Sequence, residues 1–307
     1  MLIAAGNIRW PTVTEALPIL IGIAAWLALY IAGMRQLRGT PRAVPGWRVV
    51  CFCGGILLIA LALLTPLAAM GDDLFWAHML EHLLIGDLGS LLLVLGLTGP
   101  LLAPILRLPG MGALRVLAHP VLAYLLWAAN LYLWHTRVLH EAAVRHDNVH
   151  ALQHMLFLAL GMNMWMALLG PLPKPAWFGN AAALGYIVAV RLTAGVLGNI
   201  FVFGGSPLYD VYRPGEAQWN ISAGGDQVTA GAVMMIEGSI VTLGLFCWLF
   251  LRAARQSEER QRLLDLAAER GVALDTRRAG RAVAAGRGAE LEQRILAGER
   301  FAPESPV

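Results

Sequence analysis

Imidazole side chains recur at helical spacing in two places along the chain. His78 and His82 are four residues apart, as are His150 and His154, so on a helix each pair would project from one face, one turn apart. His135 closes another apolar run. Neutral imidazole is a common ligand of copper and other transition metals. We therefore predict that these five histidines bind a soft metal ion.

Other polar residues near the predicted ligands could bind the same ion or hydrogen-bond to its ligands. Glu81 falls between His78 and His82 in angle and could accept a hydrogen bond from an imidazole. Asp226 opens the last apolar run, where it would be either the N-cap of that helix or a partner of the metal site. These additional candidates are Glu81, His140, His146 and Asp226.

Three charged residues lie inside apolar runs, at similar predicted depths near the middle of a membrane. They are Asp87, Arg191 and Glu237. Because a lone charge in lipid costs several kcal/mol, Arg191 is predicted to pair with Asp87 or with Glu237. A structural clamp is the favoured interpretation of this pair, and a proton or ion relay is the alternative.

The composition indicates a membrane protein. The 307 residues are 58% hydrophobic and 14% charged, against about 25% charged in soluble domains, and the mean hydropathy is +0.62. A membrane-spanning helix needs about 17–25 apolar residues. Seven runs qualify: 16–34, 49–69, 76–98, 118–136, 148–170, 183–203 and 227–251. The predicted fold is an all-α, polytopic seven-transmembrane-helix bundle.

The predicted organisation has three parts. Residues 1–15 form an outer N-terminal segment, residues 16–251 the membrane domain, and residues 252–307 a charged cytoplasmic tail. The first apolar run is too long for the core of a signal peptide and is expected to remain as an anchor. For the tail we expect a solvated helix or a disordered end.

The charges in the loops predict the orientation. With the N-terminus outside, the inner loops carry seven basic residues and no acid, whereas the outer segments carry eight acids against four arginines. Excess Lys and Arg mark the cytoplasmic side, so the C-terminus is predicted to be cytoplasmic. Seven of the eight histidines then lie on the outer side.

Several function classes find no support in the sequence. There is no nucleic-acid-binding motif, and no nucleophile–base pair or phosphate loop, so we do not expect an enzyme. The three cysteines form no CxxC pair. Cys51, Cys53 and Cys247 could pick up copper on the inner side, although buried apolar filler is the simpler interpretation.

The order and spacing of these motifs resemble a known family. The chain carries His78-x-x-x-His82, Trp134-His135, His146-x-x-x-His150-x-x-x-His154, and Asp226-Gln227 followed by Ala230-Gly231 and Met234. Over roughly residues 15–250 this pattern resembles the multi-spanning, seven-helix CtaG family of cytochrome c oxidase assembly factors. The chain departs from the family pattern at His140, Gln153 and Met235.

The resemblance implies copper handling at the outer face of a bacterial inner membrane. It marks the five histidines as metal ligands and Met234, with Asp226, as a last-helix motif near the metal. The implied function is to bind copper, with Cu(I) as the expected species, and help deliver it to the oxidase copper centre, with an oxidase subunit or another copper chaperone as partner. The alternatives are a haem-binding membrane redox protein with axial histidines, and a copper transporter.

Overall fold

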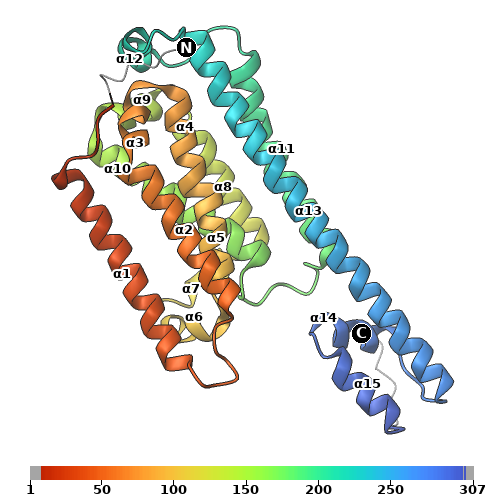
Figure 1. Cartoon of the computed structure of the whole chain (residues 1–307). Helices are drawn as coiled ribbons and strands as arrows, with labels where there is room; N and C mark the ends of the chain where they lie inside the picture. The colour runs from red at the N-terminus through yellow and green to blue at the C-terminus, as the bar shows by residue number, and fades with distance from the viewer. Residues whose placement is uncertain (1–7, 300, 302–307) are drawn as a thin grey trace. The chain divides into compact units, whose positions relative to one another are not determined.

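The computed structural model describes residues 8–299 and 301, which form helices joined by turns and contain no strand. The predicted all-α fold is therefore confirmed (Figure 1). The chain divides into two compact units, one ending at Thr242 and the other starting at Leu243. Residues 1–7 of the predicted outer segment, and residues 300 and 302–307 of the predicted tail, lie outside the described residues.

Six helical segments of the described chain are long and apolar enough to cross a membrane. They are α1 (Val13–Leu37), α2 (Gly46–Leu64), the continuous run Phe75–Gly96, α10 (Asp147–Leu169), α11 (Asn180–Phe203) and α13 (Ala223–Glu269). The predicted span 118–136 corresponds to α8 (Pro120–Trp134), which is apolar but only 15 residues long. A count of seven spans and the orientation of the bundle both remain predictions.

Local capping signals set the helix ends. Thr12 and Glu15 form a capping box before α1, in which each side chain accepts a hydrogen bond from the other's backbone amide. The predicted span 49–69 is too long, because α2 ends at Leu64 and a separate helix, α3 (Pro66–Asp73), begins at a proline. Proline is favoured in the first turn of a helix and ends the one before it.

The run Phe75–Gly96 contains a change of helix type. It begins as α4 (Phe75–Leu83), passes through the π-helical segment η1 (Leu84–Gly89), and continues as α5 (Ser90–Gly96). A π-helical turn is rare and is often found at functional sites. Here it follows directly after His82 and contains Asp87.

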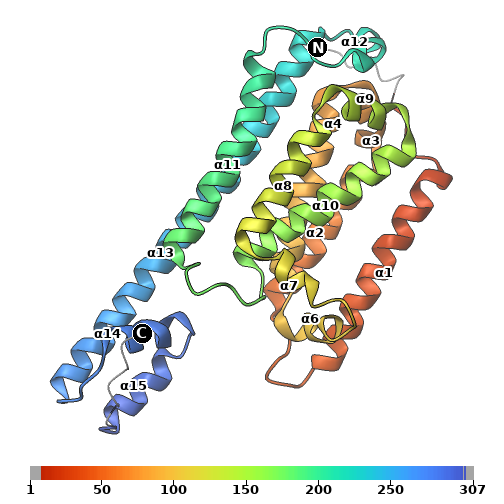
Figure 2. The same ribbon diagram turned by 180° about the vertical axis from the view of Figure 1, so that it is seen from behind.

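Contacts of α10 with η1 and α5, which continue from α4, bring α10 near α4. α10 packs against α8, η1 and α5, and α2 packs against α5 (Figures 1 and 2). At Gly161 of α10, an added methyl group would collide with the carbonyl oxygen of Gly86 in η1. Small residues allow such backbone contact between membrane helices. The two histidine-bearing helices are consequently held at short range.

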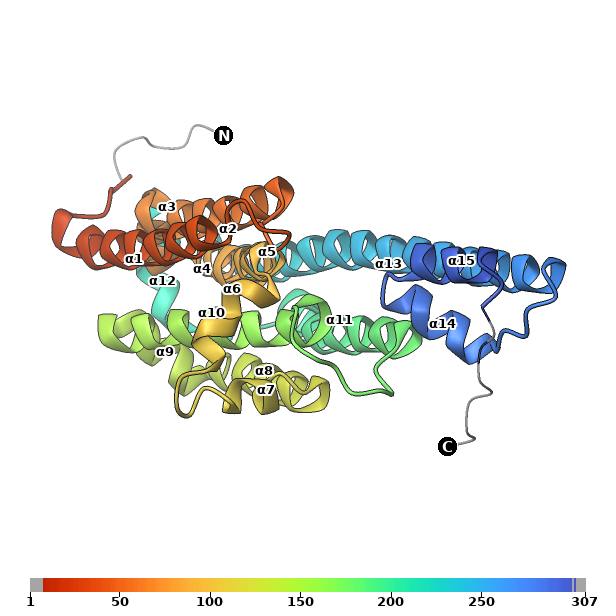
Figure 3. The same ribbon diagram turned by 90° about the horizontal axis from the view of Figure 1, so that it is seen from below.

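The second unit has its own small core. The end of α13 packs against α14 (Thr276–Ala284) and α15 (Gly288–Leu296), as Figure 3 shows. The core residues are Leu263, Ala267, Val283, Leu291 and Ile295. The described part of the predicted tail is therefore helical, which agrees with the first of the two expected alternatives and not with a disordered end.

Candidate metal centre

Two histidine pairs face each other across neighbouring helices. His78 and His82 come from α4, and His150 and His154 from α10. The ring centroids are 5.0 Å apart for His78 and His150 and 5.3 Å apart for His82 and His154. The i, i+4 spacing thus delivers both pairs to one place, as predicted from the sequence.

These side chains form two overlapping sets with the spacing of metal ligands. One ring nitrogen from each of His78, His82 and His150 lies within 4.8 Å of the others. Glu81, His150 and His154 form a second set with the same spread. Glu81 Oε1 lies 3.7 Å from His154 Nε2. Because His150 belongs to both sets, an ion would have two adjacent coordination positions available.

The cluster is buried and rich in unpaired polar atoms. Among the described residues, the following buried atoms find no hydrogen-bond partner: Nε2 of His78, His150 and His154, both ring nitrogens of His82, and Oε2 of Glu81. Leaving a buried polar group unpaired costs about 1–3 kcal/mol, and such groups are uncommon. A cation bound among these atoms would satisfy them together, so the donor set fits a transition metal.

A hydrogen bond to the backbone orients the ring of His78. His78 Nδ1 donates to the carbonyl oxygen of Gly71 at 3.3 Å. A hydrogen bond from one ring nitrogen fixes the tautomer and leaves the other nitrogen free to bind metal. For His78 the free atom is Nε2, which is one of the unpaired atoms of the cluster.

The structure does not bring His135 into either set. It follows the last residue of α8, and its Nδ1 lies 2.6 Å from the carbonyl oxygen of Leu131. Its Nε2 faces the sulfur of Met79 at 3.3 Å. Met79 was not predicted from the sequence, since nothing in its spacing distinguishes it from a packing residue.

The other two candidate histidines differ in their surroundings. His140 lies in α9 (Arg137–Arg145), fully buried, and its Nε2 forms a 2.8 Å hydrogen bond with the hydroxyl of Tyr212. Burial, reinforced by His135 and His150, holds the pKa of His140 well below its usual range, so the ring is neutral at neutral pH. His146 is the exposed N-cap of α10 and belongs to neither ligand set.

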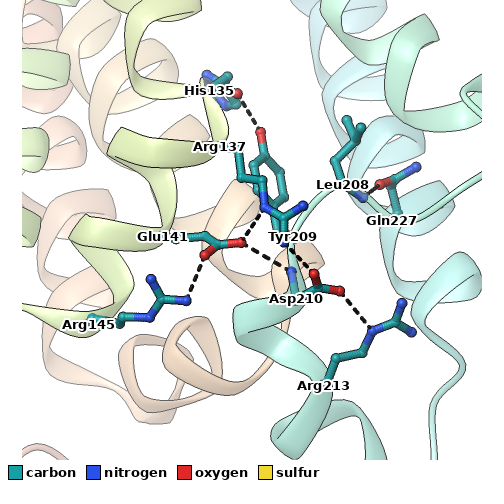
Figure 4. Close-up of polar contacts among 9 residues, drawn as sticks. All are labelled: His135, Arg137, Glu141, Arg145, Leu208, Tyr209, Asp210, Arg213 and Gln227. Atoms are coloured by element: carbon teal, nitrogen blue, oxygen red, sulfur yellow. Dashed lines mark hydrogen bonds and ion pairs between the residues drawn. The ribbon is translucent and has the colours of Figure 1, made fainter.

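An ion-pair network fastens the loop before the short helix η2 (Asp210–Tyr212) to α9 (Figure 4). Glu141 accepts hydrogen bonds from Arg145 at 2.6 Å and Arg137 at 3.0 Å, and Arg137 also pairs with Asp210. Burial alone would raise the pKa of Glu141, but the two arginines outweigh it and lower the pKa below its ordinary value. From the same loop, Tyr209 donates to the backbone oxygen of His135 at 2.7 Å.

Asp226 has a role that the sequence analysis did not anticipate. α13 begins at Ala223, so Asp226 lies inside its first turn and is not its N-cap. Its carboxylate instead accepts hydrogen bonds from the amides of Phe75 at 2.8 Å and Trp76 at 2.9 Å. These amides open α4, and helix N-termini leave such donors unpaired. Asp226 therefore anchors the helix that carries His78 and His82.

The three charged residues predicted inside the apolar runs meet. Arg191 Nη1 lies 2.9 Å from Asp87 Oδ2 and 3.7 Å from Glu237 Oε2. Either carboxylate was predicted as the partner of Arg191, and in the structure Arg191 contacts both. The three side chains also line a cavity of about 50 Å³ that extends to His82, His135 and Met234.

Comparison with known proteins identifies a family and several relatives of this chain. Residues 28–256 match the model of the cytochrome c oxidase caa3 assembly factor (Caa3_CtaG) family. An uncharacterized protein of Mycobacterium leprae is 24% identical over 267 residues, covering 81% of this chain and 40% of that protein. Uncharacterized proteins of Mycobacterium bovis and Mycobacterium tuberculosis are each 25% identical over 272 residues, covering 80% of this chain and 41% of theirs.

The chain thus spans about two fifths of the length of the curated relatives it matches. No solved structure matches it. The family model covers most of the chain, including the facing histidine pairs, Asp226 and the three charged residues. This chain belongs to the cytochrome c oxidase caa3 assembly factor family.

Proposed function

We propose that this protein binds copper as Cu(I) in the histidine cluster and helps deliver it to the copper centre of cytochrome c oxidase. The family provides the link to oxidase assembly. The observation that carries the copper proposal is the buried set of unpaired ring nitrogens from His78, His82 and His150. Neutral imidazoles are suitable ligands for copper, and metal binding requires them unprotonated.

The second ligand set supports a delivery role. Glu81 and His154 lie beside the three imidazoles and share His150 with them. Exchange of one ligand at a time between the sets would let the ion leave without losing all of its bonds at once. We infer that the protein holds copper for transfer and does not catalyse a reaction. The receiving partner would be an oxidase subunit or another copper chaperone at the outer face of a bacterial inner membrane.

The cluster geometry favours copper over haem. The ring centroids of His150 and His154 are 4.2 Å apart, and those of His78 and His82 4.3 Å. With the facing pairs also in contact, a porphyrin could enter only if α4 and α10 separated. For a copper transporter, the inner cysteines offer weak support, since Cys53 is exposed on α2 and side chains at i and i+2 diverge on a helix.

Copper binding can be tested on the full chain purified in detergent. We expect the protein to retain Cu(I) against a chromogenic Cu(I) chelator, and the double variant His78→Ala/His150→Ala to lose one equivalent. His146→Ala, at the exposed N-cap of α10, is the matched control and should behave as wild type. Unchanged copper content in the double variant would refute the proposal, and a strong Soret band in the purified protein would favour haem.

A further inference from the structure

We propose that Met79, His135 and Met234 form a second Cu(I) site, separate from the histidine cluster and joined to it through His82. This inference rests on the proposed function in taking copper as the metal. His135 belongs to neither ligand set of the cluster. It lines the cavity of about 50 Å³ described above together with Met79 and Met234, whose thioethers give this site sulfur donors that the cluster lacks.

The tautomer of His135 follows from its partners. Its Nδ1 lies 2.6 Å from the carbonyl oxygen of Leu131, which can only accept a hydrogen bond. Nδ1 must therefore carry the proton, and Nε2 presents a lone pair. A ring protonated on both nitrogens would bury a positive charge against the aromatic rings of Phe157 and Phe201, whose centroids lie 6.1 and 5.8 Å away.

The lone pair of Nε2 points at a second electron-pair donor. The sulfur of Met79 lies 3.3 Å away, and a thioether has no proton to donate. Met79 is only 1% exposed, so solvent does not reach the contact between its sulfur and Nε2. Two facing lone pairs repel each other, whereas a soft cation bound by both would convert the repulsion into two bonds.

The distance fits one ion bound to both atoms. A tetrahedral ion such as Zn²⁺, with bonds of about 2.0 Å to nitrogen and about 2.3 Å to sulfur, separates the two donors by about 3.5 Å. The observed 3.3 Å requires only a small outward shift of the Met79 side chain. Methionine is unbranched and adapts readily to such a shift.

The cavity supplies the space and the third ligand. Met79, His135 and Met234 all line the cavity of about 50 Å³, and His82 stands in its wall as well. One water-sized particle needs about 10–15 Å³ of such volume, so the cavity can hold an ion together with water. Neither ring nitrogen of His82 has a partner among the described residues. His82 is therefore available to both sites.

The ligand types imply that the two sites differ in metal selectivity. Two thioethers and one imidazole are soft donors that select Cu(I) over harder divalent ions, and the carboxylates of Asp87 and Glu237 that line the same cavity are paired with Arg191. The cluster, with Glu81 in its second set, is less selective. We infer that the cluster receives the ion and that the Met79–His135–Met234 site retains it in the reduced state, with His82 exchanging between them.

The test uses Cu(I) titration and X-ray absorption at the copper edge on the full chain in detergent. We expect two equivalents of Cu(I) in the wild type, with sulfur among the scatterers. Met79→Leu/Met234→Leu should bind one equivalent with nitrogen or oxygen scatterers only. Met155→Leu, which alters an exposed methionine of α10, is the matched control and should keep both. Leucine is close to methionine in volume, so folding should survive.

The outcomes separate this inference from the proposed function. One equivalent in the wild type, without sulfur scattering, would overturn the second site and leave the histidine cluster standing. No bound Cu(I) in the wild type would overturn both. The variant His78→Ala/His150→Ala should retain one sulfur-bound equivalent. Loss of that equivalent would show that sulfur and histidines form a single site, and would equally overturn the inference.

Discussion

Asp226, in the first turn of α13, holds the N-terminal end of α4, the helix that carries His78 and His82. Its carboxylate is fully buried and accepts the hydrogen bonds of two α4 amides. Carboxylate acceptors at a helix N-terminus also interact favourably with the helix dipole. The effect on His78 and His82 is indirect, because the residue fixes the backbone from which both side chains project.

Replacing Asp226 by alanine should destabilise the protein and weaken copper binding. Loss of a helix cap costs about 0.5–2 kcal/mol, and here two buried amides lose their acceptor. Asp226→Asn retains one neutral acceptor and should have a smaller effect. Thermal unfolding in detergent and copper titration measure both consequences. Asp147→Asn, at an exposed position in the first turn of α10, is the control, and an Asp226→Ala variant as stable as this control would contradict the assigned role.

The network around Glu141 predicts a stability that depends on pH. Because the arginines lower the pKa of Glu141 below the ordinary 4.5, the folded state binds its proton less readily than the unfolded state. Its contribution is present above pH 4.5 and is lost as the pH falls through the lower folded value. Arg137 and Arg145 are 60% and 55% exposed, so solvent screening keeps this contribution small.

Glu141→Gln should therefore lower the melting temperature at pH 7 and flatten its decline as the pH falls below 4.5. Thermal unfolding across this range measures both effects. Glu258→Gln changes an exposed glutamate of α13 and should follow the wild-type profile. A parallel decline in the wild type and Glu141→Gln would show that the network contributes nothing to acid sensitivity.

The sequence predicted the residues that act through regular spacing and missed those that act through tertiary contact. The i, i+4 pattern was sufficient to predict that each histidine pair shares one helix face, and four of the five histidines meet. Asp226 could not be assigned, because its partners lie 150 and 151 residues away. Met79 carried no signal, since its contact with His135 brings together residues 56 positions apart in the sequence.

At the scale of elements, the separation of α4–η1 from α10 decides whether the cluster can form. Gly161 lets α10 approach the backbone of η1 at Gly86. The sequence predicted the long apolar helices from hydrophobicity alone, but not the π-helical turn or the break at Thr65. Hydropathy reports how much of a helix is apolar and does not report where backbone geometry changes.

Gly161→Ala should disrupt both packing and metal binding. The added methyl group would meet the carbonyl oxygen of Gly86 well inside contact distance, and overpacking of this kind costs about 1–3 kcal/mol. The shift would move His150 and His154 away from His78 and His82. Copper titration and thermal unfolding should both detect the loss.

The matched control for that change is Gly195→Ala. Gly195 lies within α11, where an added methyl group meets nothing within 4 Å. Alanine favours a helix over glycine by about 1 kcal/mol, so this variant should be as stable as the wild type or more so. If both substitutions had the same effect, close approach at Gly161 would not be what positions the cluster.

For the whole molecule, delivery to an oxidase requires the histidine cluster to lie on the same side of the membrane as the receiving partner. α9 and the N-terminal ends of α4 and α10 surround the cluster. The uneven distribution of arginine and acids among the loops predicts that this end lies outside and that the loop containing α7 (Ala113–Leu117) lies in the cytoplasm. Delivery to a partner at the outer face therefore depends on this orientation, whereas copper binding does not.

Cysteine labelling in intact cells tests this orientation. In a background with Cys51, Cys53 and Cys247 changed to serine, Val138→Cys should react with a membrane-impermeant maleimide, because Val138 is 79% exposed on α9. Val116→Cys, 64% exposed on α7, should react only after the cells are permeabilised. The reverse pattern would place the cluster in the cytoplasm. Copper would then have to be received before export, and a partner at the outer face could not take it directly from these histidines.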